Sequence, residues 1–397
     1  MRRIIIIISI VLGVLALLIG VYFAWQKSKT ILTPPAVSQP VNQGGTVINQ
    51  GAIINQTAGT TGQSVAPKLK IISDQPVFDY WVYTSSSGQT ETFYLDQKGQ
   101  ILKVKEKDEK QDTIITSGAF DNPQAIKATL DGKQVLIKSG SLDLPNFTIF
   151  NVETKIQQLL PQGITAASWS ADGKKIAYLE SPQESKLPTG QAKAGKSDLV
   201  ILDLSGQKQK TTKIISLSQN DFDLQWTQAE KFILTPKSST FYQGTAWSFN
   251  SKNKTFTPLA PDSYGLIIKW SADGKLGLKF STKSQGEKGS LSLINDGAQI
   301  RANLNFLTLP DKCFISEPKI YCAVPQAIPL NAVLPDDYFK KAVYFNDSIY
   351  QIDINQNSLI EIFTASEPSL DVSHLTWSNN RLLFINRYDN NLYSLEL

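Results

Sequence analysis

The sequence predicts an all-β chain folded as a seven-bladed β-propeller with four-stranded blades, preceded by one N-terminal transmembrane helix. Three observations support this fold class: a repeated phrase with Trp, Asp and Gly at fixed spacing, short alternating strands over residues 68–397, and an uncharged apolar run near the N-terminus. We expect four segments: residues 1–3 as a cytoplasmic head, 4–25 as the membrane helix, 26–67 as a flexible linker and 68–397 as the propeller.

The composition excludes several classes of protein. The 397 residues include 39 Lys and Arg against 35 Asp and Glu, and a net charge of +4 is too small for this length to indicate nucleic-acid binding. Two cysteines exclude a disulfide scaffold and a multi-cysteine zinc module, and one histidine excludes a poly-histidine metal site. The charge excess matches four residues that flank the apolar run, namely Arg2, Arg3, Lys27 and Lys29, so the rest of the chain is formally neutral.

The apolar run Ile4–Trp25 predicts a membrane anchor. A helix of this length spans the ~30 Å hydrocarbon core, and Tyr22 and Trp25 stand at its far end, where amphipathic rings prefer the headgroup level. The alternative is a cleavable signal peptide, which would have a shorter apolar region followed by small residues. Because a short head stays in the cytoplasm more easily than a large tail, we expect a single-pass cell-membrane protein with its N-terminus inside and the propeller outside the cytoplasm.

The segment Thr30–Ala66 predicts a tether. It is rich in Gly, Gln, Asn, Thr and Pro and contains no charged residue. Such a composition does not bury enough apolar surface to order itself, which favours a flexible coil. Its related pieces V-I-N-Q-G and I-I-N-Q-T leave open the alternative of β structure formed with a partner.

A repeated phrase predicts the propeller blades. Trp169–Glu180 reads WSADGKKIAYLE and Trp270–Phe280 reads WSADGKLGLKF. Weaker copies occur at Ala128–Lys138, Trp226–Leu234, Cys313–Cys322, Trp377–Ile385 and, weakest, Tyr80–Trp81. Seven copies at intervals of about 47 residues, each continuing into further short strands, are typical of four-stranded blades. The Asp-Gly pair suits a tight hairpin turn, because Gly adopts positive φ without penalty, and we expect each Trp to fill the space between adjacent blades.

The two ends of the repeat region predict closure of the propeller. The last unit has three strands, Val372–Ser378, Arg381–Arg387 and Asn391–Leu397, and lacks a fourth. The segment Lys68–Ser73 resembles a fourth strand and precedes the first unit. We therefore expect the N-terminal strand to complete the last blade, which removes open sheet edges.

The phrases WSADGKKIAYLES and DLVILDLSGQK resemble the repeat of TolB-like propellers, a WD-like repeat also seen in the propeller regions of prolyl-oligopeptidase-type peptidases. The resemblance is clear in the third and fifth units and implies fold more than function. The sequence departs from both families. Residues 26–67 do not match the additional α/β domain of TolB proteins, and the chain lacks the G-x-S-x-G element of the peptidases.

No motif indicates catalytic, cofactor-binding or metal-binding residues. His374 is the only histidine, and we expect a surface or packing role for it. Turn contexts explain the aspartates at positions 172, 203, 273 and 296. Three others precede inner strands and remain candidates for a carboxylate group in the central channel: Asp79, Asp221 and Asp223.

Cys313 and Cys322 lie on consecutive strands of one hairpin around Glu317-Pro318. An oxidising compartment favours a disulfide between them, and two buried thiols remain the alternative.

Two insertions interrupt the blades. Ser181–Lys196 predicts a mobile loop, and Val324–Asn346 predicts a loop with a short helix over Asp336–Tyr344. Long loops on a rigid scaffold commonly carry binding, so Tyr338, Phe339 and Tyr344 are candidate partner-binding residues. Alternatively, these aromatic residues simply cover the sixth blade.

Together these features favour a non-catalytic protein-interaction or cell-envelope scaffold module without a cofactor, whose protein partner and oligomeric state the sequence does not indicate. Two alternatives remain: a carbohydrate-active enzyme that uses carboxylates at the central channel, and the ligand-sensing ectodomain of a membrane complex.

Overall fold

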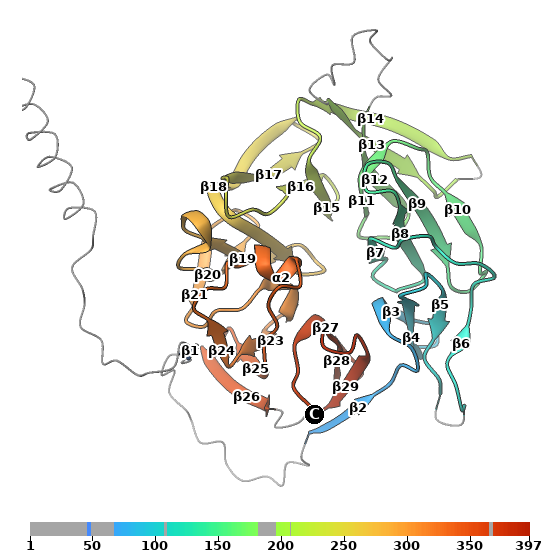
Figure 1. The fold of residues 1–397 in the computed structure, drawn as a ribbon. Coiled ribbons are helices and arrows are strands. Elements are labelled where there is room, and N and C mark those ends of the chain that lie inside the picture. Colours follow the sequence, from blue (N-terminus) through green and yellow to red (C-terminus); the bar gives the residue numbers. More distant parts are fainter. Residues whose placement is uncertain (1–45, 49–66, 107–108, 182–195, 207, 365–367) are drawn as a thin grey trace, which may run out of the picture. The chain divides into compact units, whose positions relative to one another are not determined.

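A computed structural model describes residues 46–48, 67–106, 109–181, 196–206, 208–364 and 368–397. The predicted head, the predicted membrane helix, most of the predicted linker and residues 182–195 of the predicted Ser181–Lys196 loop lie outside this part. Residues Thr46–Leu397 form one compact unit built almost entirely of strands (Figure 1). Its described helical segments are short: the 3-10 helices η1 (Ser284–Gly286) and η2 (Pro310–Lys312), and α2 (Asp336–Phe339).

Antiparallel sheets of four strands follow one another along the chain. Sheet 1 contains β3 (Val77–Thr84), β4 (Thr90–Asp96), β5 (Ile101–Lys103) and β6 (Thr113–Ile114). Sheet 2 contains β7 (Ala125–Ala128), β8 (Gln134–Gly140), β9 (Pro145–Asn151) and β10 (Gln157–Leu159). Sheet 3 contains β11 (Ile164–Trp169), β12 (Lys175–Glu180), β13 (Ser197–Asp203) and β14 (Lys210–Leu217).

The next two sheets share one long strand. Sheet 4 contains β15 (Phe222–Gln228), β16 (Lys231–Pro236), β17 (Gly244–Asn250) and the first part of β18 (Thr255–Trp270). Sheet 5 contains the second part of β18 with β19 (Leu276–Thr282), β20 (Ser290–Asn295) and β21 (Ile300–Leu304). Within β18, residues 255–263 pair with β17, whereas residues 264–270 pair with β19. One strand therefore ends one sheet and begins the next.

The last two four-stranded sheets complete the series. Sheet 6 contains β22 (Cys313–Ser316), β23 (Lys319–Pro325), β25 (Asp347–Asp353) and β26 (Ser358–Thr364). Sheet 7 contains β27 (Val372–Ser378), β28 (Arg381–Asn386), β29 (Leu392–Glu396) and β2 (Lys68–Ile71). A separate two-stranded sheet joins β1 (Thr46–Ile48) to β24 (Ala327–Pro329), so a short strand lies within the predicted linker.

An apolar cluster lies between each pair of consecutive sheets, from the pair formed by sheets 1 and 2 to the pair formed by sheets 6 and 7. A further cluster joins sheet 7 to sheet 1, where Leu383 and Ile385 pack with Val77 and Tyr94. The order of contacts therefore closes on itself. As expected, four buried tryptophans lie between neighbouring sheets: Trp81, Trp169, Trp226 and Trp270.

The Asp-Gly turns adopt the geometry that the repeated phrase predicts. In the turn after β7, Gly132 has φ of 70°, and an added Cβ would lie 2.0 Å from the carbonyl oxygen of Val82 in sheet 1. The Oδ1 atom of Asp131 accepts hydrogen bonds from the Thr129 hydroxyl and from the Lys133 N–H. Glycine is required here both for positive φ and for close approach to the preceding sheet.

The predicted closing strand is confirmed. β2 pairs antiparallel with β29, with Lys68 opposite Glu396 and Ile71 opposite Tyr393. The Ser73 hydroxyl also accepts a hydrogen bond from the Leu392 N–H at 3.0 Å. Sheet 7 is thus built from both ends of the predicted propeller.

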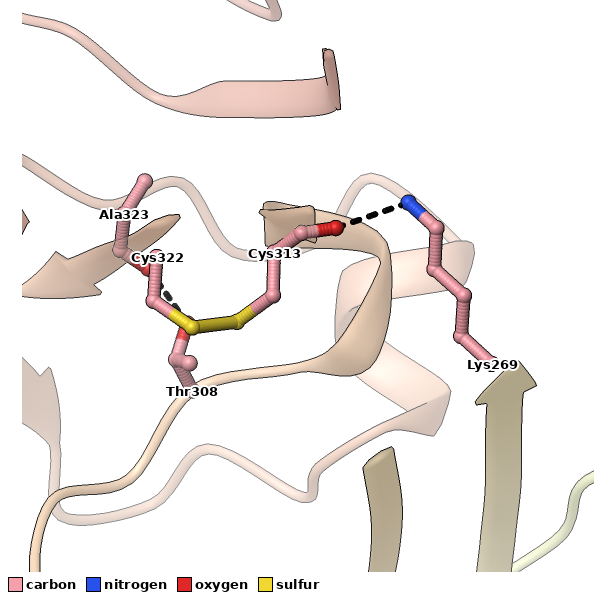
Figure 2. The surroundings of a disulfide bond; sticks show 5 residues. All are labelled: Lys269, Thr308, Cys313, Cys322 and Ala323. Carbon is pink, nitrogen blue, oxygen red and sulfur yellow. Dashed lines mark hydrogen bonds between the residues drawn. A yellow bond between two sulfur atoms is a disulfide. The ribbon is translucent and has the colours of Figure 1, made fainter. Parts of the chain in front are cut away.

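A disulfide joins the first two strands of sheet 6 (Figure 2). Cys313 and Cys322 are direct partners in the register of β22 and β23, and both are fully buried. Beside the disulfide, the Lys269 ammonium donates a hydrogen bond of 2.9 Å to the Cys313 carbonyl oxygen, which links sheet 5 to sheet 6.

Deleting Asn391–Leu397 should abolish the cooperative thermal unfolding transition, because the deletion removes β29 from between β28 and β2. Circular dichroism of the full chain in detergent provides the measurement. As a control, Glu396→Gln on the same strand removes only an exposed ion pair with Lys70 and should change the free energy of unfolding by less than about 1 kcal/mol. A truncated protein with an unchanged transition would refute closure by the N-terminal strand.

Candidate functional site

The connection between β23 and β25 is the longest connection within sheet 6, and it carries α2. The sequence predicts a helix over Asp336–Tyr344, but the structure contains only Asp336–Phe339. The helix is short because Lys341 has φ of 56°, outside the helical region. The base of the connection is closed by a hydrogen bond, in which the Gln326 N–H donates to the Asn346 carbonyl oxygen at 2.8 Å.

The three candidate partner-binding residues differ in exposure. Phe339 and Tyr344 are 54% and 38% exposed, whereas Tyr338 is only 4% exposed. The Tyr338 ring stacks on the buried Phe345 ring with the centroids 6.2 Å apart, so it packs on the inner side of the connection. Phe339 and Tyr344 are accessible to a partner, whereas the Tyr338 ring is buried in this structure.

Three further exposed aromatic residues lie near α2. Tyr388, between β28 and β29, stacks on Tyr344 with the centroids 5.4 Å apart. Phe241 and Tyr242 belong to the connection between β16 and β17, where the hydroxyl of the adjacent Thr240 donates to Asp336 at 3.1 Å. We call the following group the aromatic surface: Phe241, Tyr242, Phe339, Tyr344 and Tyr388.

A buried ionic network contacts the connection between β23 and β25. The Lys312 ammonium is 2.6 Å from Asp347 Oδ2 and 2.5 Å from Asp371 Oδ1, and Arg387 Nη1 is 2.6 Å from Asp371 Oδ2. All four side chains are buried, and the two cations balance the two carboxylates. Burial raises the pKa of Asp347 to about 6, with the charge of Lys312 opposing this shift and that of Asp371 adding to it.

Arg387 connects this network to the aromatic surface. Its guanidinium donates hydrogen bonds to the carbonyl oxygens of Tyr338 at 2.8 Å and Val343 at 3.3 Å. The same group lies 3.8 Å from the Tyr338 ring centroid and 4.8 Å from that of Tyr344. Removing one partner of a buried ion pair typically costs about 3–5 kcal/mol, so the network fixes the connection that presents the aromatic side chains.

A second polar group forms where the first strands of several sheets approach one another. His374 Nε2 lies 3.9 Å from Asp79 Oδ2 and 4.0 Å from Asp311 Oδ1, and Lys269 interacts electrostatically with both carboxylates. These four residues, which we call the His374 cluster, come from or immediately precede the first strands of sheets 1, 5, 6 and 7.

The backbone of His374 is strained. Its φ is 54°, and the register of β27 against β28 shifts between Ser373 and Thr376. A bulge of this kind re-aims a side chain, and a non-glycine residue at positive φ commonly marks a functional position. The imidazole is 43% exposed and therefore accessible to solvent.

The pKa values of the two carboxyl groups in the His374 cluster are shifted in opposite directions. Burial raises the pKa of Asp79. Burial also opposes ionisation of Asp311, but the charges of His374, Lys269 and Lys312 outweigh it and lower the pKa of that carboxyl. For His374, burial opposes the charged ring, yet the charges of Asp311 and Asp79 prevail and raise its pKa above 6.5. The cluster therefore combines a carboxyl group whose ionised form is favoured, Asp311, with an imidazole whose protonated form is favoured, His374.

The other candidate carboxylates do not join this cluster. Asp223 is largely exposed and pairs with Lys127 at 2.9 Å, beside a hollow of about 240 Å³ between β7, β11 and β15. Asp221 pairs with Lys237 at 3.2 Å. Two carboxylates, rather than three, thus converge on His374. Within the described ranges, no group of three or more His, Cys, Asp or Glu side chains is arranged to hold a metal ion.

A larger hollow of about 630 Å³ does not coincide with either group. It lies between sheets 7 and 1 and is lined by residues that include Lys70, Thr90, Lys103 and Arg381. Lys103 in this hollow pairs with Glu91 at 2.7 Å and with Glu106 at 2.8 Å, so its positive charge is already balanced by carboxylates of the same lining.

The raised pKa of His374 is directly measurable because the chain has one histidine. In a protein without a histidine tag, NMR titration of its ring should give a pKa above 6.5 that falls in Asp311→Asn and in Asp79→Asn. Asp223→Asn is the matched control and should leave the pKa unchanged. Since the folded-state pKa is raised, the resulting stabilisation is complete below about pH 6.5 and is lost as pH rises through the folded-state pKa. A His374 pKa that is the same in the unmodified protein, in Asp311→Asn and in Asp79→Asn would contradict the geometry of the cluster.

No family model and no curated protein sequence matches this chain. Solved structures do match it. TolB from Acinetobacter baumannii aligns with a TM-score of 0.40 and 15% identity over 80% of this chain, which spans 62% of the TolB chain. Oligogalacturonate lyase from Vibrio parahaemolyticus aligns with a TM-score of 0.52 and 10% identity, covering 84% of this chain and 98% of the lyase.

The β-propeller domain of Cps50 (Swd1) from Myceliophteria thermophila gives a TM-score of 0.51 at 7% identity, covering 83% of this chain and all of that domain. Identities this low establish fold and not activity. Together with the closed series of sheet contacts, the two likenesses with TM-scores above 0.5 confirm the expected fold: the chain is a β-propeller.

Proposed function

We propose that this chain is a seven-bladed propeller that acts outside the cytoplasm as a membrane-anchored, non-catalytic protein-interaction or cell-envelope scaffold module. The blade number is supported by sheets 1–7, each of four strands and each packed on the next. The anchor is supported by the apolar sequence Ile4–Trp25, which lies outside the described residues. Among the helices that the structure describes, none has both the length and the apolar character needed to cross a membrane.

The aromatic surface is the observation that carries this proposal. Tyrosine and phenylalanine are enriched in protein–protein interfaces because they bury a large area with few rotatable bonds. Here the exposed rings come from three separate connections, and one of them, Tyr344, lies against Arg387 of the buried network. A rigid base of this kind lowers the entropy lost when a partner binds.

A carbohydrate-active enzyme is the second candidate. It is favoured by the His374 cluster, since two carboxylates whose pKa values shift in opposite directions can act as an acid and a base. The fold likeness to oligogalacturonate lyase is compatible with this alternative. Cleavage of acidic or neutral oligosaccharides that disappears in Asp311→Asn would support it. A third candidate, a ligand-sensing ectodomain, would need a further membrane partner.

Site-specific photo-crosslinking in intact cells tests the interaction proposal. A photoreactive phenylalanine analogue placed at Tyr242 or at Tyr388 should crosslink the same protein, because both positions belong to one surface. Combining either probe with Phe339→Ser should reduce the crosslinked product by about tenfold or more, as truncation of an interface anchor does.

Leu159, an exposed apolar residue on the outer strand β10, provides the control. A probe at Leu159 should not capture this protein, and Leu159→Ser should leave the crosslinks at Tyr242 and Tyr388 intact. Different proteins at the two probe positions, or products that are insensitive to Phe339→Ser, would contradict a shared binding surface.

A further inference from the structure

The strand β24 has an unusual position in sheet 6. Within that sheet β23 pairs directly with β25, so β24 lies in the connection between them and is not part of the four-stranded sheet. Its partner in the structure is β1, with Val47 opposite Ile328 and Ile48 opposite Ala327. A segment from the predicted tether thus pairs with the same connection that carries Phe339 and Tyr344.

The structure holds β24 in place independently of β1. The hydrogen bond from Gln326 to Asn346 closes the base of the connection, and the Ala332 N–H donates to the Pro329 carbonyl oxygen at 3.0 Å. Ile328 packs against the apolar cluster between sheets 5 and 6. An extended segment with fixed ends is pre-organised to accept another strand.

The composition of both strands suits weak, exchangeable pairing. Exposed strand edges are commonly protected by charges, but neither β24 nor the tether segment Thr30–Ala66 contains a charged residue. Pro329, opposite Thr46, has no N–H to donate, which limits the length of the hydrogen-bonded ladder. Pairing over three residues is too weak to persist between separate molecules at low concentration.

Covalent connection compensates for this weakness. The chain between β1 and β2 is about 20 residues long, and a linker of this length gives an effective concentration in the millimolar range. β2 lies in sheet 7, which packs directly on sheet 6. The tether also contains the related sequences Thr46–Gln50 (TVINQ) and Ala52–Gln56 (AIINQ), so it offers two segments with the same apolar pair followed by Asn-Gln.

We propose that β24 is a strand-binding edge for extended, uncharged segments with a β-branched apolar pair, and that the chain's own segment Thr46–Ile48 occupies this edge in the free protein. Occupancy holds Thr46–Ile48 against the connection that carries Phe339 and Tyr344. A partner that adds a strand at β24 must displace the tether, so binding of the partner and docking of the tether oppose each other. The displacement step rests on the proposed interaction function, because the displacing strand would come from the protein partner. The docking of Thr46–Ile48 on β24 does not depend on that function.

Cysteine crosslinking in the full-length chain tests the docking. Opposite residues of an antiparallel pair have Cβ atoms 4.5–5.5 Å apart, so Val47→Cys combined with Ile328→Cys should form an intramolecular disulfide under mild oxidation. The native cysteines are joined to each other and do not compete. The control pair is Ser64→Cys with Ile328→Cys, which places a thiol elsewhere in the tether. We expect crosslinking of the 47–328 pair to be about tenfold faster than that of the control pair.

A peptide with the sequence of residues 44–51, GGTVINQG, provides the second arm. Added at about ten times the effective concentration of the tethered segment, it should slow crosslinking of the 47–328 pair by about tenfold through competition for β24, whereas a peptide of the same composition in scrambled order should not. Any of three results would overturn the proposal: equal crosslinking rates for the two cysteine pairs, a disulfide that forms only between two molecules, or a 47–328 crosslinking rate that the peptide does not change. Because disulfide crosslinking of the 47–328 pair needs no partner protein, its outcome is independent of the photo-crosslinking result at Tyr242 and Tyr388.

Discussion

The fold depends on the closure between sheet 7 and sheet 1. Each sheet is stabilised by apolar side chains shared with its two neighbours, so an open series would leave two apolar faces exposed to water. Closure covers both faces at once, through the packing of Leu383 and Ile385 against Val77 and Tyr94. The Tyr80 hydroxyl adds hydrogen bonds to the carbonyl oxygens of His374 and Leu383, both at 2.7 Å. The pairing of β2 with β29 secures this junction, because it makes sheet 7 depend on segments from both ends of the propeller.

Closure also explains the position of the polar groups. When the first strands of the sheets approach one another, side chains that are distant in sequence become neighbours, as in the His374 cluster. The buried network forms between sheets 6 and 7, where Lys312 and Asp347 of sheet 6 and its preceding turn meet Asp371 and Arg387 beside the strands of sheet 7. Neither group has an internal sequence motif. Each is created by the packing of sheets, but the charges of the network are buried whereas the His374 imidazole is partly exposed.

Local patterns predicted the blades well. The phrase around Trp169 and Trp270 contains its own turn, strand and interface residue, so it identifies a sheet without knowledge of distant contacts. The closing role of Lys68–Ser73 followed from counting strands at the C-terminus. The candidate site was only partly predictable. Phe339 and Tyr344 were recognised because their loop is long, but the burial of Tyr338 depends on Arg387, which lies in another sheet. Phe241, Tyr242 and Tyr388 occur in short connections without distinctive spacing, and the pairing of β1 with β24 is a contact between segments about 280 residues apart.

Native-state hydrogen exchange tests the closure most directly. If closure constrains the whole propeller, the slowest amides of β2, β29 and β3 exchange only through global unfolding, with the same free energy of opening as the slowest amides of β12 in sheet 3. Exchange of β2 and β29 at a free energy several kcal/mol lower, with β12 still protected, would show that the junction opens independently and would contradict the account.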